Sequence, residues 1–181
     1  EPNSRLQPET IRTYEAVLEQ SLNTAVKLTG SAFYYDVKDL TTLDYGTSVI
    51  TFQNLEKASA LGGELGVEGR WENGWFGRLS YTAQRAEDGD GIELSNSPRS
   101  LGKLHVRVPV VKDRLFLGTE LQYIGSARAV QSGRVGEAWL ANITLLSQEL
   151  VRNLEISASI YNVFDRRYGN TGFDEHRQRV L

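Results

Sequence analysis

Long stretches of this chain alternate apolar and polar residues with a period of two. The clearest stretch runs from Asn153 to Tyr168, where one set of side chains is apolar (Leu154, Ile156, Ala158 and Ile160) and the intervening set is polar (Glu155, Ser157 and Ser159). Successive side chains of a strand point to opposite faces, so this pattern predicts a two-faced strand. The alternation continues to Phe164. Strands of soluble proteins usually have about five or six residues, whereas crossing a bilayer at a tilt takes about ten.

The same pattern recurs along most of the chain and predicts an all-β, antiparallel up-and-down meander of about eight strands, forming a fragment of a large transmembrane β-barrel. The lipid-facing and lumen-facing sets would then alternate, with Leu154, Ile156, Ala158 and Ile160 directed away from the barrel axis and Glu155, Ser157 and Ser159 toward it. The expected strands are approximately Glu9–Gln20, Thr24–Val37, Lys57–Trp71, Trp75–Gln84, Ser97–Val111, Leu115–Tyr123, Trp139–Leu145 and Asn153–Phe164.

Short turns and long polar connections alternate between these strands, as at the two ends of an outer-membrane barrel. The expected short turns are Ser21–Asn23, Glu72–Gly74, Lys112–Asp113 and Gln148–Arg152, and the long connections are Lys38–Glu56, Glu87–Asn96 and Gly125–Gly136. Outward aromatic residues also fall at two heights, with Trp71 and Trp75 beside a short turn and Tyr123, Trp139 and Phe164 near the long-loop end. Two such bands are typical of aromatic girdles at the membrane interfaces.

Composition excludes several other classes of protein. The net charge of −3 gives no basic surface for nucleic acid. With no cysteine there is no disulfide and no Cys-based metal site. The chain also lacks methionine, so we expect a mature or excised piece of a longer protein. No apolar run approaches the roughly 18 residues of a membrane-spanning helix, an absence that barrel strands share because their average hydropathy is low.

Near the C-terminus, the segment Asn162-Val163-Phe164-Asp165-Arg166-Arg167-Tyr168 resembles the Asn-x-Phe-Asp-x-x-Tyr signature of TonB-dependent outer-membrane receptors. Further segments resemble the same family in the family's order. They are Leu6-x-Pro8-Glu9 with Tyr14-Glu15, Gly62-Gly63-Glu64-Leu65, and Asn96-Ser97-Pro98. Val17 departs from the pattern, because the first of these strands usually has a glycine there.

The resemblance implies that residues 1–181 are the C-terminal portion of a receptor barrel, without the plug domain and without an aromatic-ended closing strand. It further implies active uptake of a scarce ligand, such as an iron–siderophore chelate or cobalamin, across the bacterial outer membrane. The implied partners are outer-membrane lipid and lipopolysaccharide, the receptor's own plug domain, the TonB complex and the small-molecule ligand. In this family the signature ends the penultimate strand at the outer rim. Two other interpretations stay open, a complete eight-stranded small barrel with a structural or adhesion role and a soluble β-sandwich binding module.

No residue pattern indicates catalysis or a cofactor. Glu64 and Glu68 share a strand face but lie about 13 Å apart along it, too far for an acid–base pair, and they read as lumen-facing charge. His105 and His176 lack metal-ligand spacing, and Asp88 to Glu93 has the carboxylate spacing of a calcium loop without its later ligands. The candidates for an anionic ligand or lipopolysaccharide are the long-loop arginines Arg128, Arg134, Arg166, Arg167, Arg177 and Arg179, for which scattered surface charge is the simpler interpretation.

The signature should have an architectural role. We expect Asp165 to accept backbone hydrogen bonds at the start of a turn, and Asn162 to bond to a neighbouring strand or to the turn. Phe164 should anchor at the interface, and Tyr168 should pack against the tail that follows. As an isolated piece, the sheet should leave its first and last strands without natural neighbours. We therefore expect an open, strongly curved sheet or pairing with another copy, whereas a ladder between those two strands would indicate the small closed barrel.

Overall fold

The computed structural model describes residues 5–44, 51–129, 133–151, 154–170 and 174–177. These residues form strands and turns, and no helix among them is long and apolar enough to span a membrane. The strands are β1 (Thr10–Ser21), β2 (Val26–Asp44), β3 (Thr51–Arg70), β4 (Phe76–Asp88), β5 (Ser100–Val111), β6 (Leu115–Ile124), β7 (Ala127–Arg128), β8 (Arg134–Val135), β9 (Ala138–Val151), β10 (Leu154–Ile160), β11 (Arg167–Asn170) and β12 (Asp174–Arg177).

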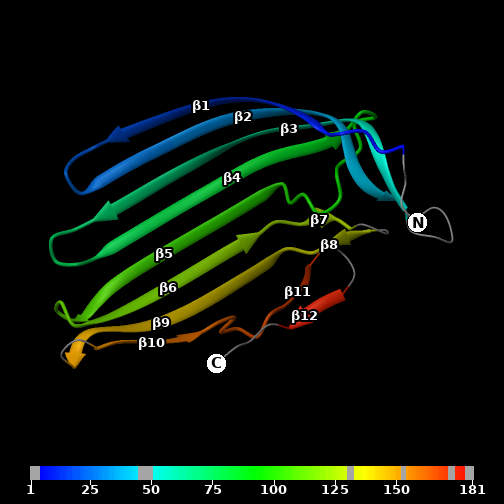
Figure 1. Cartoon of the computed structure of the whole chain (residues 1–181). Coiled ribbons are helices and arrows are strands. Elements are labelled where there is room, and N and C mark those ends of the chain that lie inside the picture. The colour runs from blue at the N-terminus through cyan, green and yellow to red at the C-terminus, as the bar shows by residue number, and fades with distance from the viewer. Residues whose placement is uncertain (1–4, 45–50, 130–132, 152–153, 171–173, 178–181) are drawn as a thin grey trace.

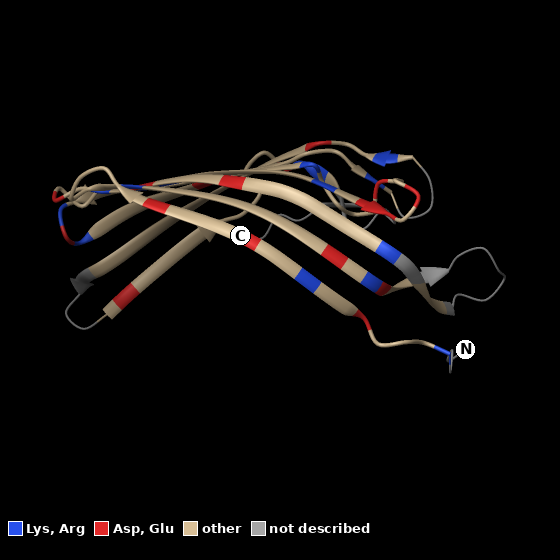
Figure 2. Ribbon diagram, turned by 90° about the horizontal axis from the view of Figure 1, so that it is seen from above, with Lys and Arg blue, Asp and Glu red and all other residues tan. Residues whose placement is uncertain are grey.

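Eight of these strands form one antiparallel sheet in the order β1-β2-β3-β4-β5-β6-β9-β10, which follows the chain (Figure 1). Seen from above, the sheet is strongly arched (Figure 2). Among the described strands, β1 pairs with β2 alone and β10 with β9 alone, so the two edges do not meet. The predicted open, curved meander is confirmed, and the ladder that would have indicated a small closed barrel is absent from the described residues.

The connections separate into two ends, as predicted. In Figure 1 the turns β1–β2, β3–β4 and β5–β6 lie at one end of the sheet, and the β4–β5 connection and the β7–β8 pair lie at the other. The β3–β4 turn has its Asn-Gly pair at the centre: Gly74 has a φ of 86°, and its N–H donates to the Trp71 carbonyl (2.9 Å). A positive φ is cheap for glycine, so this residue sets the tight turn. Pro109 precedes a register shift in the β5–β6 ladder, near the end of its strand.

The connection predicted over Lys38–Glu56 is wrong in extent. β2 continues to Asp44 and β3 begins at Thr51, and their ladder resumes at Leu40↔Leu55 beyond a break at Asp39, whose φ is 56°. The polar composition suggested a loop, but two strands pair through their backbone groups, and this pairing does not require an apolar face.

The predicted boundaries near the C-terminus also need correction. β9 runs to Val151, so the turn expected over Gln148–Arg152 is mostly strand. β10 ends at Ile160 instead of reaching Phe164, because Asn162 adopts a φ of 48° and turns the chain out of the extended conformation. The Gly125–Gly136 connection contains the small β7–β8 pair, and the polar tail contains the β11–β12 pair.

The register sorts the side chains into two faces across the whole sheet. Pairings such as Leu28↔Val67, Val67↔Leu79, Leu79↔Leu104 and Leu104↔Leu121 make one continuous row, which belongs to what we term the apolar face. Leu65 on this face is 72% exposed. The buried apolar residues are mostly alanines (Ala58, Ala86, Ala127, Ala129 and Ala138), with Phe116 the one large side chain among those described. A soluble β-sandwich would bury the row at Leu104 against a second sheet, so that interpretation is wrong.

Ser157 and Ser159 pair with Leu146 and Thr144, and Ile156, Ala158 and Ile160 pair with Ser147, Leu145 and Ile143. Ile160 and Ala158 thus share the face of Ile143 and Leu145, as the alternation predicts. Glu155 lies at a register shift between Leu154 and Ile156, so the ladder does not fix its face. The orientation of Glu155 relative to a barrel axis stays a prediction.

Candidate functional site

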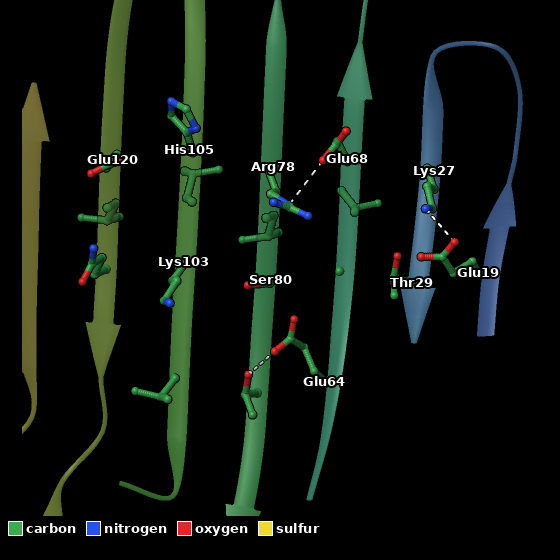
Figure 3. A pocket seen from close by; sticks show the side chains of 18 residues that line it. Glu19, Lys27, Thr29, Glu64, Glu68, Arg78, Ser80, Lys103, His105 and Glu120 are labelled. Atoms are coloured by element: carbon green, nitrogen blue, oxygen red, sulfur yellow. Dashed lines mark hydrogen bonds and ion pairs between the residues drawn. The ribbon is translucent and has the colours of Figure 1, made fainter. Parts of the chain in front are cut away.

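The face opposite the apolar one, which we term the polar face, carries a groove crossed by charged and hydrogen-bonding side chains from six strands, β1 to β6 (Figure 3). Its registered row runs Lys27↔Glu68, Glu68↔Arg78, Arg78↔His105 and His105↔Glu120. A strand slipped by one residue would exchange this row for the apolar one, so the charge pattern fixes the register. Inward polar residues of this kind are what a water-filled barrel interior requires.

The charges of the polar face are paired both within β3 and between neighbouring strands. Lys27 Nζ lies 2.7 Å from Glu19 Oε2, and Glu68 binds both Arg70 (2.9 Å) and Arg78 (3.4 Å). The Thr82 hydroxyl donates to Glu64 Oε2 at 2.8 Å, and the Asn142 amide donates to Glu120 Oε2 at 3.1 Å. Glu64 and Glu68 therefore serve in separate contacts, as expected of lumen-facing charge, and do not form a carboxylate pair.

Gly62 and Gly63 are needed where β3 lies close to its two neighbours. A Cβ at Gly62 would lie 2.5 Å from Phe33 Cζ and 2.7 Å from the Ala83 carbonyl oxygen, and one at Gly63 would lie 2.9 Å from the Ser31 oxygen. The Gly-x-Glu-Leu segment therefore has a packing reason for its glycines. The β3–β4 register places Glu64 level with Thr82 on β4.

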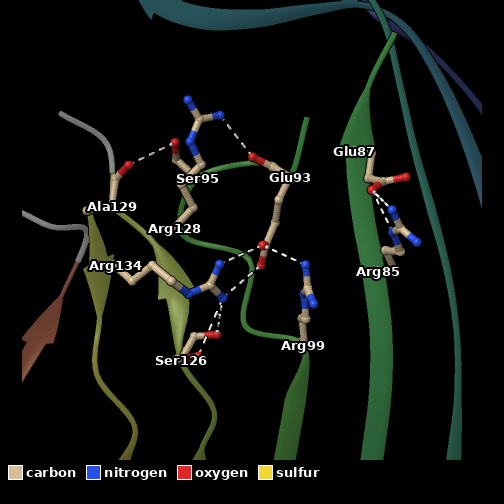
Figure 4. A network of polar contacts seen from close by, with 9 residues as sticks. All are labelled: Arg85, Glu87, Glu93, Ser95, Arg99, Ser126, Arg128, Ala129 and Arg134. Atoms are coloured by element: carbon tan, nitrogen blue, oxygen red, sulfur yellow. Dashed lines mark hydrogen bonds and ion pairs between the residues drawn. The ribbon is translucent and has the colours of Figure 1, made fainter. Parts of the chain in front are cut away.

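At the long-loop end, Glu93 organises a second polar site, the Glu93 cluster, defined by Glu93, Arg99, Arg128 and Arg134 (Figure 4). Its carboxylate accepts from Arg134 (2.8 and 3.3 Å) and from Arg99 (3.0 Å), and its backbone carbonyl accepts from Arg128 (3.0 Å). The Glu93 side chain is only 10% exposed. The cluster joins the β4–β5 connection to the β7–β8 pair, and the Arg128 carbonyl also accepts from the Asn96 N–H (2.9 Å).

The arginines of the cluster lower the pKa of Glu93. The hydrogen bond from Arg134 is the largest cause that holds the pKa of Glu93 below its ordinary value, and Arg99 acts in the same direction. Burial of the carboxyl acts against them, raising the pKa, without reversing the net direction. The same bond to Glu93 raises the pKa of Arg134 above its ordinary value. Glu93 is thus ionised throughout the neutral range.

The predicted arginine candidates separate into two groups. Arg128 and Arg134 are bound to Glu93 and hold two connections together. Arg166 and Arg167 are exposed, and the β11–β12 register places Arg167 opposite Arg177. Like charges opposite one another in a ladder destabilise it unless an anion intervenes. Arg179 lies outside the described residues. The sequence analysis did not identify Glu93 as the centre of the cluster, because Glu93 is the last of several acidic residues between Asp88 and Glu93 and nothing in the sequence sets it apart.

The signature segment forms a turn around Asn162, whose exposed fraction is 4%. Its Oδ1 accepts from the Arg166 N–H and its Nδ2 donates to the Arg166 carbonyl, both at 2.9 Å. Its own N–H donates to Asn142 Oδ1 on β9 (2.9 Å). The prediction that Asn162 bonds to a neighbouring strand or to the turn is confirmed, since it does both. Phe164 is 68% exposed. The roles predicted for the Asp165 carboxylate and for Tyr168 stay predictions.

The remaining motif residues make contacts with neighbouring strands. Glu9 Oε1 accepts a hydrogen bond from the Thr41 N–H (2.7 Å). The rings of Tyr14 and Tyr34 are tilted relative to each other, with their centroids 6.3 Å apart, and Glu15 is opposite Phe33 in the ladder on the polar face. The Pro98 carbonyl accepts from Gln84 Nε2 (3.0 Å).

The acidic loop and the aromatic bands can also be placed. Asp88 Oδ1 accepts from the N–H groups of Asp90 (3.0 Å) and Ile92 (2.9 Å), which closes the loop on itself. Within the described ranges, no group of three or more His, Cys, Asp and Glu residues is arranged to hold a metal ion. Trp71 and Trp75 flank the β3–β4 turn. The ring centroids of Tyr123 and Trp139 lie 4.8 Å apart near the other end of the sheet, so these aromatic residues lie at the two expected heights.

Comparison with known proteins adds to this geometry. A family model described as "TonB dependent receptor-like, beta-barrel" matches residues 1–163. Among solved structures, the ferric-catecholate import receptor Fiu from Escherichia coli K12 is 22% identical, with a TM-score of 0.72, over 98% of this chain and 27% of the receptor. The ferric yersiniabactin uptake receptor FyuA from Yersinia pestis is 23% identical, with a TM-score of 0.75, over 94% of this chain and 27% of the receptor.

The copper transporter OprC gives a TM-score of 0.78 at 17% identity, over 96% of this chain and 29% of the transporter. These likenesses concern the fold, and the chain spans little more than a quarter of the length of each matched protein. No curated protein sequence matches the chain.

Proposed function

Because the chain belongs to the family of TonB-dependent receptor β-barrels, we propose that it forms part of the wall of an outer-membrane receptor that imports a scarce metal chelate. The protein is an outer-membrane barrel of Gram-negative type, as its family is. We further propose that residues 1–181 are the C-terminal portion of that barrel. The plug domain and the closing strand would lie elsewhere in the receptor.

The observation that carries this proposal is the separation of two faces across a single open sheet. The apolar face is continuous over the sheet, and the polar face carries the paired charges of Figure 3. A soluble antiparallel sheet covers its apolar face with a second layer, whereas here Leu65 is 72% exposed, as suits a face in contact with lipid. The unpaired outer edges of β1 and β10 would each continue into further strands, because an open edge within a bilayer leaves backbone groups unsatisfied.

The receptor's role in transport follows from the family and from the segregated ends. The short turns would face the periplasm, and the long connections, including the Glu93 cluster, would face outward where the ligand arrives. Energy would come from the TonB complex acting through the plug domain. The exposed arginines near β11 would meet anionic groups, either on the ligand or on lipopolysaccharide.

A ferric siderophore is the ligand class that we propose. Fiu, FyuA and the ferripyoverdine receptor of Pseudomonas aeruginosa are named for ferric chelates, and OprC is named for copper. Cobalamin is the alternative. The chelate would be cargo, and the wall would act on it by shape and charge.

The proposal can be tested by transport in intact cells. Cells that express the full receptor should accumulate radiolabelled iron from a ferric siderophore, and cells without the receptor, or without TonB, should not. Parallel assays with labelled cobalamin and with copper would identify the ligand class. Normal uptake of every probe after deletion of the receptor would contradict the transport function, provided that no second receptor for the same ligand remains in the strain.

A further inference from the structure

The polar face ends, on the side of the short turns, in an arrangement of arginines and aromatic rings that the wall function does not explain. We term it the arginine–aromatic row: Arg70, Phe76, Arg107 and Phe116. The ladder sets Phe76 level with both Arg70 and Arg107, and Pro109, two residues after Arg107, is level with Phe116. The Phe76 ring lies 4.8 Å from the Arg70 guanidinium and 5.9 Å from that of Arg107, which also lies 5.2 Å from the Phe116 ring.

Arg107 differs from the other guanidiniums around it. Arg70 and Arg78 both bind Glu68. In the described part of the chain, Arg107 forms no ion pair, and its Nε is buried without a hydrogen-bond partner. The nearest acid by register is Glu120, which is opposite His105 and accepts from Asn142. Arg70 and Arg78 thus share the Glu68 carboxylate, and among these three guanidiniums Arg107 is the one left without a counter-charge.

Aromatic rings stabilise a cation, but they accept none of the hydrogen bonds that a guanidinium donates. Two rings that hold Arg107 in place therefore prepare its donors for an acceptor that comes from elsewhere. A carboxylate suits this role because its two oxygens match the planar fork of a guanidinium. The positive excess also selects an anion over a neutral amide.

We propose that Arg107 binds the carboxylate of an acidic side chain from a part of the receptor outside this chain, inside the barrel at its short-turn end. This inference rests on the proposed function, since it takes the polar face as the lining of the barrel. Charge complementarity supports an acidic partner. The matched receptors are more than three times as long as this chain, so ample polypeptide exists to supply one.

The test uses the intact receptor in outer membranes, with Arg107→Lys as the reporter. A water-soluble carbodiimide joins a lysine amine to a carboxylate in direct contact and leaves a guanidinium unmodified. Peptide mass spectrometry should then find position 107 joined to an Asp or Glu outside residues 1–181, and the unmodified receptor should lack this product. The ion pair of Lys27 with Glu19 (2.7 Å) provides an internal positive control in every sample.

A matched control is Arg78→Lys, which should couple to Glu68 within the chain because Arg78 already lies 3.4 Å from it. Coupling of position 107 to Glu120 would overturn the proposal, as would no coupling when the product of Lys27 with Glu19 forms. Inorganic phosphate serves as the probe for the alternative that Arg107 binds a small free anion instead of an acidic side chain. If phosphate raises the thermal midpoint of the unmodified receptor but not of Arg107→Gln, and position 107 couples to no acid, the proposal is wrong.

These outcomes are separable from failure of the transport function. A receptor that imports none of the probes and still gives the predicted product would refute the proposed function and leave the inference about Arg107 intact. A receptor that imports a ferric chelate normally and gives no product at position 107 would support the proposed function and refute the inference about Arg107.

Discussion

Replacing Asn162 should destabilise the barrel through the turn that ends β10. Asn162→Ala removes two hydrogen bonds to Arg166, each 2.9 Å long, and leaves that residue's N–H and carbonyl without these partners. Buried hydrogen bonds contribute about 1 kcal/mol each, and an unsatisfied partner raises the cost. The φ of 48° adds a further strain of about 1 kcal/mol when asparagine becomes alanine. The expected loss of unfolding free energy is therefore about 3 kcal/mol.

Two further variants separate these contributions. Asn162→Gly keeps the backbone conformation at no steric cost but loses both side-chain bonds, so we expect about 2 kcal/mol. Asn96→Ala is the matched control, because Asn96 has a φ of 57° and is exposed. It should lose about 1 kcal/mol, the backbone contribution alone.

The assay is equilibrium unfolding of the intact receptor by urea in lipid vesicles, with folded molecules counted by their heat-modifiable migration on gels. Binding of the chelate to the folded molecules is measured alongside and should be unchanged. If Asn162→Ala were no more destabilising than Asn96→Ala, the two bonds to Arg166 would contribute nothing and the reasoning would fail. A large loss of ligand affinity with normal stability would instead assign the signature to the binding site.

Three other outcomes are expected. Acidification should release the Glu93 cluster, because the pKa of Glu93 is lower in the folded protein than in the unfolded chain, where it is about 4.5. The stability that the ionised carboxylate contributes is fully present above pH 4.5. It is lost as the pH falls through the lower folded-state pKa. Proteolysis of the β4–β5 connection should therefore accelerate on acidification of the unmodified receptor. In Glu93→Gln, proteolysis at neutral pH should already be as fast as in the acidified unmodified receptor. Gly62→Ala should lower the yield of folded barrel by crowding Phe33 and the Ala83 carbonyl, whereas Gly66→Ala, with its nearest neighbour at 3.8 Å, should fold normally; equal yields would refute the packing argument. Leu65→Arg on the apolar face should cost about 2–4 kcal/mol in vesicles and Gln122→Arg on the polar face far less, and the reverse order of unfolding free energies would mean that the faces are assigned the wrong way round.

The period-two pattern alone determined the class of fold, the approximate number of strands and the division into two faces. Side-chain alternation follows directly from strand geometry, and the alternative registers would move charges such as Glu64 and Glu68 onto the apolar face. The turn at Asn73-Gly74 was equally visible, because its backbone conformation favours those residue types. These features are local or periodic, and they need no knowledge of which strands meet.

Only the tertiary structure decided the ends of strands and the partners of charges. Residues 40–44 of β2 pair with residues 51–55 of β3 because the two strands satisfy each other's backbone groups, a pairing that composition does not reveal. Glu93 is bound by Arg99 and Arg134, which are 6 and 41 residues away along the chain. The same holds for Arg107. It has no carboxylate partner among the described residues, and this is visible only once Glu68 and Glu120 are seen to be engaged elsewhere. Ion pairs between distant segments depend on register and loop path, which no local pattern encodes.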